Sequence, residues 1–508
     1  MKRLRLAAVL SILLAAAPSG SAGETDRDPF AIDLATALKL ADLDNTKVAL
    51  AREKIAEAEA RLLQARTLLL PDLSAGASYH RHEGPLQETN GNVLDVDRSS
   101  RFAGLGAGAV GAGDVQIAGV GLKVDLAEAF YAPLAARQRA DSARAESDAV
   151  RNRVLFETAA AWYELLRARG ALQIAGEAHE NAKALADATN SFAETGQGLE
   201  SDSERAAVEA LVRERDTEVA RENLALASIR LAALLRIDPA TRLSPVGSAD
   251  ARSEWVDLSE DVAVLTDLAL KSRPELAGSD AELAATWRDL ERHRYSPLIP
   301  KLAVGASTGG FGGDNDASPG SGDQRTDVSA ALYWQIHGLG LGQHAGVREK
   351  SSLWKQAKIT RSDVEITVAA EVAAAFASAR SRDARIAIGR DAIARARRSY
   401  ELNRSRVFEN QGLPIEVLQA IQSLVSARTL YLDSVIDYNL AQIQLYTALG
   451  QPVSSAEAAA ENRAPTPSEA AEETPSGVAD PSQPAETAPS SESAGSRAKR
   501  FGFFGRNR

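Results

Sequence analysis

The sequence predicts a mainly α-helical chain built from one unit that occurs twice, in which two strands are followed by a very long helix. The phrase LLLPDLSAGASYH around Pro71 returns as PLIPKLAVGASTGG around Pro300, and LAALLRIDP, ending at Pro239, returns as LYTALGQP, ending at Pro452. Long helical runs without proline separate these phrases. Internal repeats determine architecture, and a repeat of strands and long helices indicates a membrane more than an enzyme.

The N-terminus is predicted to be a secretory signal peptide over residues 1–22. Basic residues precede an apolar run over Leu6–Ala17, and small residues follow up to Ala22. No later stretch offers the ~18 uninterrupted apolar residues that a spanning helix needs. If the mature chain enters a membrane, it must therefore do so as a closed β-barrel, in which every backbone polar group has a partner.

Four strands are predicted, two in each half. They alternate apolar and polar side chains, as tilted membrane strands do, and lie at Pro71–His82, Ile117–Leu126, Pro300–Phe311 and Arg325–Ile336. The stretches between them, 83–116 and 312–324, are rich in Gly, Asp and Asn and are expected to be exposed loops. The pattern alone fits a soluble hairpin equally well. Single-chain membrane barrels start at ~8 strands, so a barrel would have to be shared, and three subunits would supply twelve strands.

The long helices are predicted at Leu134–Ala193 and His344–Asn410, with lengths of ~90 and ~100 Å. Their apolar stripes are narrow and rich in alanine, which is typical of helices that pack side by side as coiled coils. Shorter helices are expected before the strands and after the long helices, at Leu34–Leu70, Val262–Arg294, Glu200–Leu235 and Ile415–Leu449. Tight glycine-bearing turns, Glu194–Ala206 and Glu409–Ala420, join each long helix to the next one.

Composition excludes several kinds of site. The 508 residues include no cysteine, which rules out a disulfide scaffold, a thiolate zinc site, a cysteine nucleophile and a lipid anchor on an N-terminal cysteine. The net charge of −11 argues against nucleic acid as a partner. His80 and His82 are expected to be a surface pair, and the glycine-rich stretch Gly104–Gly113 lacks the lysine of a phosphate loop. We therefore expect no catalytic site and no cofactor.

The duplicated layout, the LLLPDLSAGASY strand entry, the G-x-G-L-x-S-D turn and the ending GLPIEVLQA…YLDSVIDYNLAQIQLYTALGQP resemble the TolC family of outer-membrane efflux proteins, the outer membrane factors. The resemblance covers residues 30–452. It implies a homotrimer with an α-helical barrel across the periplasm and a shared twelve-stranded β-barrel in outer-membrane lipid. It also implies a passive exit duct for efflux or type I secretion, whose partners are a periplasmic adaptor and an inner-membrane transporter.

On this interpretation residues 23–453 form the duct, with structural repeats at about 30–240 and 258–453. Residues 454–508 are expected to be a disordered tail that ends in basic and aromatic residues. The alternative is a soluble periplasmic coiled-coil adaptor or scaffold. An adaptor normally has one helical hairpin between small β domains, whereas this chain has two hairpins and two pairs of strands.

The resemblance also implies functional residues at the two turns. Asp202 and Glu416 would form acidic rings at a periplasmic pore constriction, with Gln419 where a second acid is often found. Both acids are equally explained as helix-start residues that the helix dipole favours. The adaptor-docking tips would comprise Gly196, Gly198, Leu199, Ser201, Gly412, Leu413 and Pro414, residue types that a helical hairpin also requires.

Overall fold

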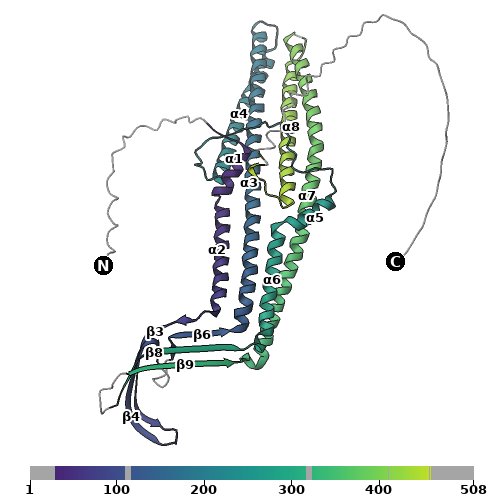
Figure 1. Ribbon diagram of the computed structural model, residues 1–508. Helices are drawn as coiled ribbons and strands as arrows, with labels where there is room; N and C mark the ends of the chain where they lie inside the picture. The colour runs from purple at the N-terminus through teal and green to yellow at the C-terminus, as the bar shows by residue number, and fades with distance from the viewer. Residues whose placement is uncertain (1–28, 109–115, 316–322, 410, 457, 459–508) are drawn as a thin grey trace, which may run out of the picture. The chain divides into compact units, whose positions relative to one another are not determined.

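The computed structural model describes residues 29–108, 116–315, 323–409, 411–456 and 458 (Figure 1). The predicted signal peptide and the predicted tail from residue 459 onward lie outside these residues. Two residues near the start of the predicted tail region are packed, because Val453 and Ala458 are buried in the main hydrophobic core.

The two long helices are confirmed as α3 (Leu126–Glu194) and α7 (Leu341–Phe408). The first begins two turns before the predicted start at Leu134. The Asp125 carboxylate caps it by accepting hydrogen bonds from the backbone N–H groups of Ala127 and Glu128, at 3.0 and 3.2 Å. Within the described residues, no helix combines the length and the apolar character that crossing a membrane requires.

The prediction of one continuous helix before the strands of each half was wrong. The first is divided into α1 (Leu34–Asp44) and α2 (Thr46–Arg66), followed by η1 (Thr67–Leu69), and the second into α5 (Val262–Ser272) and α6 (Pro274–Tyr295), followed by η2 (Ser296–Leu298). Each break is one residue in an extended conformation. Asn45 caps α2 by accepting from the Lys47 N–H at 2.8 Å, and Arg273 precedes Pro274, which disfavours the helical conformation there.

These breaks receive the ends of the helices that follow the turns, α4 (Glu200–Leu234) and α8 (Pro414–Ala448). The Asn45 side chain donates to the Leu234 carbonyl at 3.3 Å. The Arg273 guanidinium donates to the Ala448 carbonyl at 3.4 Å in the second half. The end of α4 therefore meets the break between α1 and α2, and the end of α8 meets the break between α5 and α6. Helix α3 packs along α2, α4, α6 and α8, and α7 packs along α6 and α8 (Figure 1).

The seven-stranded sheet corrects the predicted loop at 83–116, which contains a long strand. Strand β3 (Ala75–Gln87) pairs with β4 (Val93–Ala107) in an antiparallel hairpin. Sequence reasoning missed β4 because its first half, VLDVDRSSR, is charged and polar on both faces. The other strands are β2 (Asp72–Leu73), β5 (Ile117–Ala118), β6 (Val120–Asp125), β8 (Lys301–Asn315) and β9 (Asp323–Tyr333).

Register shows that the described sheet still consists of four strand paths. Strand β6 pairs with residues 301–306 of β8, and β4 pairs with residues 308–315 of the same strand. Strands β4 and β6 thus lie end to end along β8, with a short excursion between them where β4 pairs with β5. The paths follow the order β2/β3, β4/β6, β8 and β9. The prediction of two strand paths in each half is therefore confirmed. The bounds predicted for the second path, Ile117–Leu126, were wrong, because this path also includes β4.

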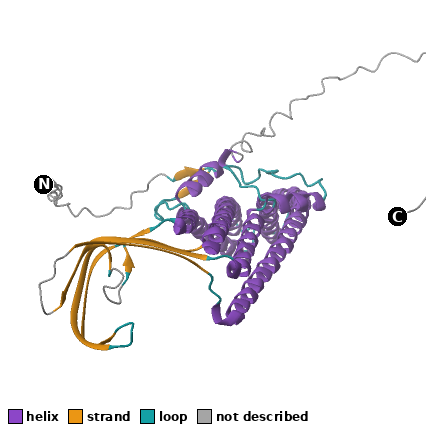
Figure 2. Ribbon diagram, turned by 60° about the horizontal axis from the view of Figure 1, so that its bottom comes forward, coloured by secondary structure: helices purple, strands orange, loops and turns teal. Residues whose placement is uncertain are grey.

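A small layer covers one face of the helices and was not predicted. It contains α1 and the parallel pair β1 (Phe30–Ile32) and β7 (Leu243–Pro245), and Figure 2 shows it together with loops on a single side of the helices. The main core lies beneath it, where buried Ile32 and Leu243 meet Trp162 and Leu165 of α3. The indole N–H of Trp162 donates to the Ile32 carbonyl at 3.1 Å.

Candidate functional site

The two turns that join the long helices to α4 and α8 have the same geometry. Leu199 and Leu413 are the N-cap residues, with nearly equal extended conformations (φ −88°, ψ 135° and φ −92°, ψ 132°). A Cβ on Gly198 or Gly412 would lie 3.0 Å from the Cβ of the residue six positions earlier, so only glycine fits without displacement. Gly196 has a φ of +72°, which also favours glycine.

The predicted acids occupy matching positions, because Asp202 and Glu416 are each the third residue of their helix. Each backbone N–H donates to the carbonyl of its N-cap leucine at 3.0 Å. The Glu416 carboxylate lies 3.4 Å from the guanidinium of Arg406 on α7, and Asp202 lies 3.9 Å from Arg205 on its own helix. Gln419 is exposed one turn beyond Glu416. The structure thus brings each acid to a helix start near a tip, and the pore-ring role stays a prediction.

The surface of each tip carries an exposed apolar side chain. Leu199 is 67% exposed and Leu413 is 60% exposed. Ser201 is exposed beside the first, and Pro414 is half-buried beside the second. Two leucines in solvent at equivalent points are suited to contact a partner, and the docking role of the tips also stays a prediction.

A segment that joins the two halves, residues 243–256, crosses the helices, and we call it the strap. Its first residue is held by Ser228 of α4, whose hydroxyl accepts from the Leu243 N–H at 2.8 Å. Its last residues are held by Gln442 of α8, whose side-chain carbonyl accepts from the N–H groups of Trp255 and Val256 at 3.2 and 2.9 Å. The strap therefore ties the first half to the second.

Further side chains of α8 complete this attachment. Asn439 accepts from the Ser253 N–H at 2.9 Å and donates to the Ala251 carbonyl at 2.8 Å. The hydroxyl of Tyr438 accepts from Gln442 at 3.0 Å and from Arg252 of the strap at 3.2 Å, and the Arg252 guanidinium lies 4.7 Å from the ring centre. Burial raises the pKa of Tyr438. Sequence reasoning missed these anchors, although polar residues inside the apolar stripe YNLAQIQL signal them.

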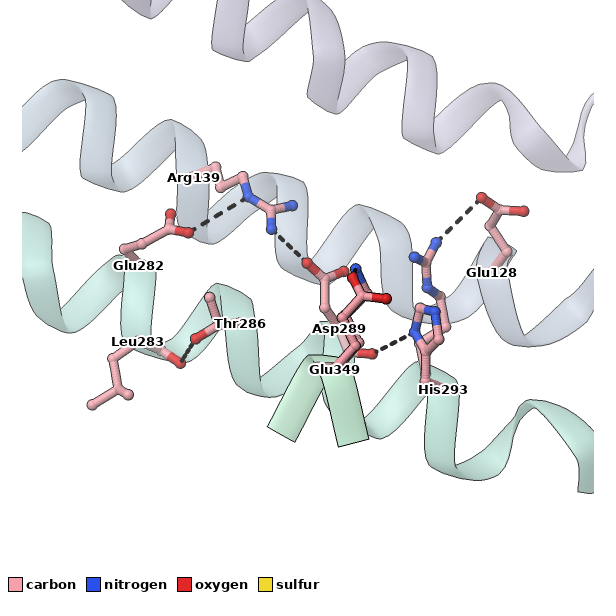
Figure 3. A network of polar contacts seen from close by, with 10 residues as sticks. Glu128, Arg139, Glu282, Leu283, Thr286, Asp289, His293 and Glu349 are labelled. Atoms are coloured by element: carbon pink, nitrogen blue, oxygen red, sulfur yellow. Dashed lines mark hydrogen bonds and ion pairs between the residues drawn. The ribbon is translucent and has the colours of Figure 1, made fainter. Parts of the chain in front are cut away.

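Ion pairs join the helices along their length. Arg167 of α3 binds Asp433 and Asp437 of α8, at 2.8 and 2.6 Å. Nearer the sheet, Figure 3 shows Arg139 of α3 reaching Asp289 and Glu282 of α6, at 2.5 and 3.9 Å. Burial raises the pKa of Glu282. These contacts hold neighbouring helices together.

Metal chemistry has no support within the described residues, where no group of three or more His, Asp or Glu side chains could hold an ion. His80 and His82 lie half-buried on one face of β3, as expected for alternate residues of a strand. Arg81 between them points to the other face and pairs with Asp97 of β4 at 2.6 Å.

Comparison with known proteins gives one family match. Residues 265–451 match the family model described as "Outer membrane efflux protein". This region contains most of α5, all of α6–α8, and β8 and β9, so it covers most of the second half of the duplicated chain. No curated protein sequence matches the chain.

Solved structures match both halves. The Campylobacter jejuni CmeC outer membrane channel has a TM-score of 0.68 and 16% identity, and the match covers 84% of this chain and 89% of that one. The open state of the Neisseria gonorrhoeae MtrE outer membrane channel has a TM-score of 0.64 and 18% identity, over 83% and 90% of the chains. CusC, described in terms of transmembrane channel formation, has a TM-score of 0.67 and 19% identity, over 82% and 92%. The chain shares their fold.

Proposed function

We propose that the chain is a passive exit duct across the outer membrane and periplasm. Residues 265–451 match the outer membrane efflux protein family model, and the fold of outer-membrane channels extends over both halves of the chain. The observation that carries the proposal is the coverage of the fold. More than four-fifths of the chain matches channels of known structure, and the matches cover about nine-tenths of those chains. The duct would serve a tripartite efflux or type I secretion system.

The alternative, a soluble periplasmic adaptor or scaffold, is tested by fractionation of cells that produce the full chain. We expect the protein in the outer-membrane fraction as an oligomer that dissociates on heating in detergent. Recovery in the soluble periplasmic fraction without such an oligomer would refute the duct.

Two exposed apolar stripes support assembly of the duct as a homotrimer. On α4, the residues that face away from α3 include Val208, Leu211 and Leu226, which are 58%, 64% and 42% exposed. On α7, Ile366 and Ile388 are 66% and 63% exposed. Within the described residues neither stripe packs on another helix. Stripes of this extent are typical of subunit contacts, and two different stripes suit the head-to-tail contact of a closed ring.

The charges of the two stripes are complementary. Helix α4 carries eight acidic and five basic residues, whereas α7 carries nine arginines and three acidic residues between Arg380 and Arg406. Glu214 and Arg395 are both exposed and lie at nearly the same level, because each is about four turns from the tip end of its helix. Opposite charges at one level favour the head-to-tail contact and disfavour contact between like edges.

Charge reversal tests this contact. We expect Arg395→Glu or Glu214→Arg alone to shift the purified protein from trimer toward monomer in native mass spectrometry. A chain that carries both reversals should regain the trimer, because the charges are again opposite. Lys183→Glu, a reversal at an exposed residue of α3 away from both stripes, is the matched control. Equal trimer fractions for all four chains would contradict the contact.

The finer roles at the tips belong to the same proposal. In a trimer Asp202 and Glu416 would each occur three times around the periplasmic opening, where close carboxylates attract cations and repel anions. The exposed Leu199 and Leu413 would meet a periplasmic adaptor that connects the duct to an inner-membrane transporter. Crosslinking from cysteine variants at these two leucines, in cell envelopes, tests the adaptor contact, and absence of any crosslinked partner would count against it.

A further inference from the structure

A polar cavity of about 670 Å³ lies under the middle of the strap, between α3, α7 and α8. Strap residues 247–250 form one wall, and the charged and aromatic residues among the rest of the lining are Arg169, Glu177, Arg397, Arg428 and Tyr431. All of these belong to one chain, and none lies on the exposed stripes of α4 and α7 described above. Assembly through those stripes therefore leaves the cavity open.

The cavity holds more positive than negative charge. Arg428 donates to the Glu177 carboxylate, and this hydrogen bond holds the pKa of Glu177 below its usual range. Arg169 donates to the Pro245 carbonyl at 2.5 Å, and within the described part of the chain it makes no ion pair with a carboxylate. Arg397 lowers the pKa of Glu177 further by its charge, yet within the described residues its guanidinium makes no hydrogen bond. Among the described lining residues, three arginines thus face two carboxylates, those of Glu177 and Asp250.

The groups that line the cavity are suited to bind a polar ligand. Arg397 is exposed and Tyr431 is half-buried on the neighbouring helix, so a guanidinium fork and a phenol border the same space. Guanidinium groups bind the two oxygens of a carboxylate or phosphate in a fork-to-fork arrangement. The volume is within the range of small-molecule sites, which are mostly apolar, whereas charged and polar groups predominate here.

We propose that this cavity binds an oxyanion carried by a polar ligand, with Arg397 as the principal contact and Arg169 and Tyr431 beside it. The source that we favour is the carboxylate-rich stem peptide of the cell wall, and this part rests on the proposed function. A duct that crosses the periplasm must pass through the wall, and the cavity lies on the face of the helices that carries the strap and the small β layer. Binding there would hold the duct in the wall at the level of the strap.

The test uses the purified full-length oligomer and isothermal titration with three probes. The probes are a soluble wall fragment with free stem-peptide carboxylates, the same fragment with its carboxylates amidated, and inorganic phosphate. We expect saturable binding of the first probe and none of the second. Arg397→Gln should weaken binding about 10- to 100-fold, as loss of a charge-assisted pair does, whereas Arg398→Gln, an adjacent exposed arginine that does not line the cavity, should leave it unchanged.

The possible results distinguish the oxyanion site from the source of its ligand. Phosphate that binds as tightly as the wall fragment, with the same loss in Arg397→Gln, would support the oxyanion site and overturn the wall as its source. Absence of binding by every probe, or binding that Arg397→Gln leaves unchanged, would overturn the site. Export is measured in parallel in cells. A chain that binds but does not export would refute the duct and keep the site, and a chain that exports without binding would refute the site alone.

Discussion

Replacement of Gln442 by alanine should release one end of the strap. The side chain is completely buried, and it accepts hydrogen bonds from two backbone N–H groups, those of Trp255 and Val256, while donating to Tyr438. In Gln442→Ala these two N–H groups have no acceptor as long as the strap stays attached to α8. A buried donor without a partner costs about 1–3 kcal/mol. The attached state is therefore destabilised relative to a locally detached state in which both N–H groups bond to water.

Hydrogen exchange read by mass spectrometry measures this release. If opening of the strap costs about 1–3 kcal/mol less in the variant, the amides of residues 253–256 should exchange about 5- to 150-fold faster. Asn439→Ala should have a similar effect centred on Ser253, because Asn439 accepts from that N–H. The exchange of α3 and α7 should change little, because the acceptors of the Ser253, Trp255 and Val256 amides all lie on α8.

Gln444→Ala is the matched control. It makes the same chemical change two residues along α8, at an exposed position. Unchanged exchange at residues 253–256 in Gln442→Ala, or equal acceleration in Gln444→Ala, would refute the attachment of the strap through Gln442. The first result would mean that the strap is held by its apolar contacts, and the second that any change in α8 loosens it.

Three further predictions concern charge. Glu416→Gln should reduce the cation preference of the duct in planar bilayers. The control Glu401→Gln, at an exposed position on α7, should leave the cation preference unchanged. Unchanged selectivity in Glu416→Gln would remove Glu416 from the constriction. The Arg151 hydrogen bonds lower the pKa of Asp42, so the stability from this pair is present at neutral pH and is lost as pH falls through that lowered value. Burial raises the pKa of Glu282, so its charge costs stability at neutral pH, and Glu282→Gln should raise the melting temperature at pH 7 and have little effect at pH 3. Melting curves of Asp42→Asn and Glu282→Gln between pH 3 and 7 check both signs, and a parallel pH dependence of the two variants would contradict them.

The sequence predicts the helical part of this fold well because the repeat is strict there. From the turns onward the two halves keep a constant spacing, so Gly198 corresponds to Gly412 and Arg236 to Gly450. Arg236 and Gly450 both have positive φ, at 56° and 81°, just beyond the ends of α4 and α8. The same backbone position is thus filled by arginine in one half and glycine in the other, because the surrounding helix end determines the conformation.

The strands were harder to predict because pairing, not side-chain pattern, defines them. The charged half of β4 has no apolar face, and only its ladder to β3 and β8 makes it a strand. The helix breaks at Asn45 and Arg273 show a similar limit. Helical periodicity continues through both, and the contact of each with the end of a distant helix decides where the break lies. The cavity under the strap depends on three helices and a crossing loop, which no local pattern reports.

The strap has a mechanical consequence for the hairpins. Its attachment at Ser228 lies 28 residues from the start of α4, so the arm of the hairpin beyond it is ~42 Å long. The second hairpin is clamped at a matching height by Asn439 and Gln442, which gives it an arm of similar length. Near the tips, buried residues of both hairpins share one hydrophobic cluster, so the two arms would tilt together about the clamp. A tilt of about 10° there would move each tip by about 7 Å.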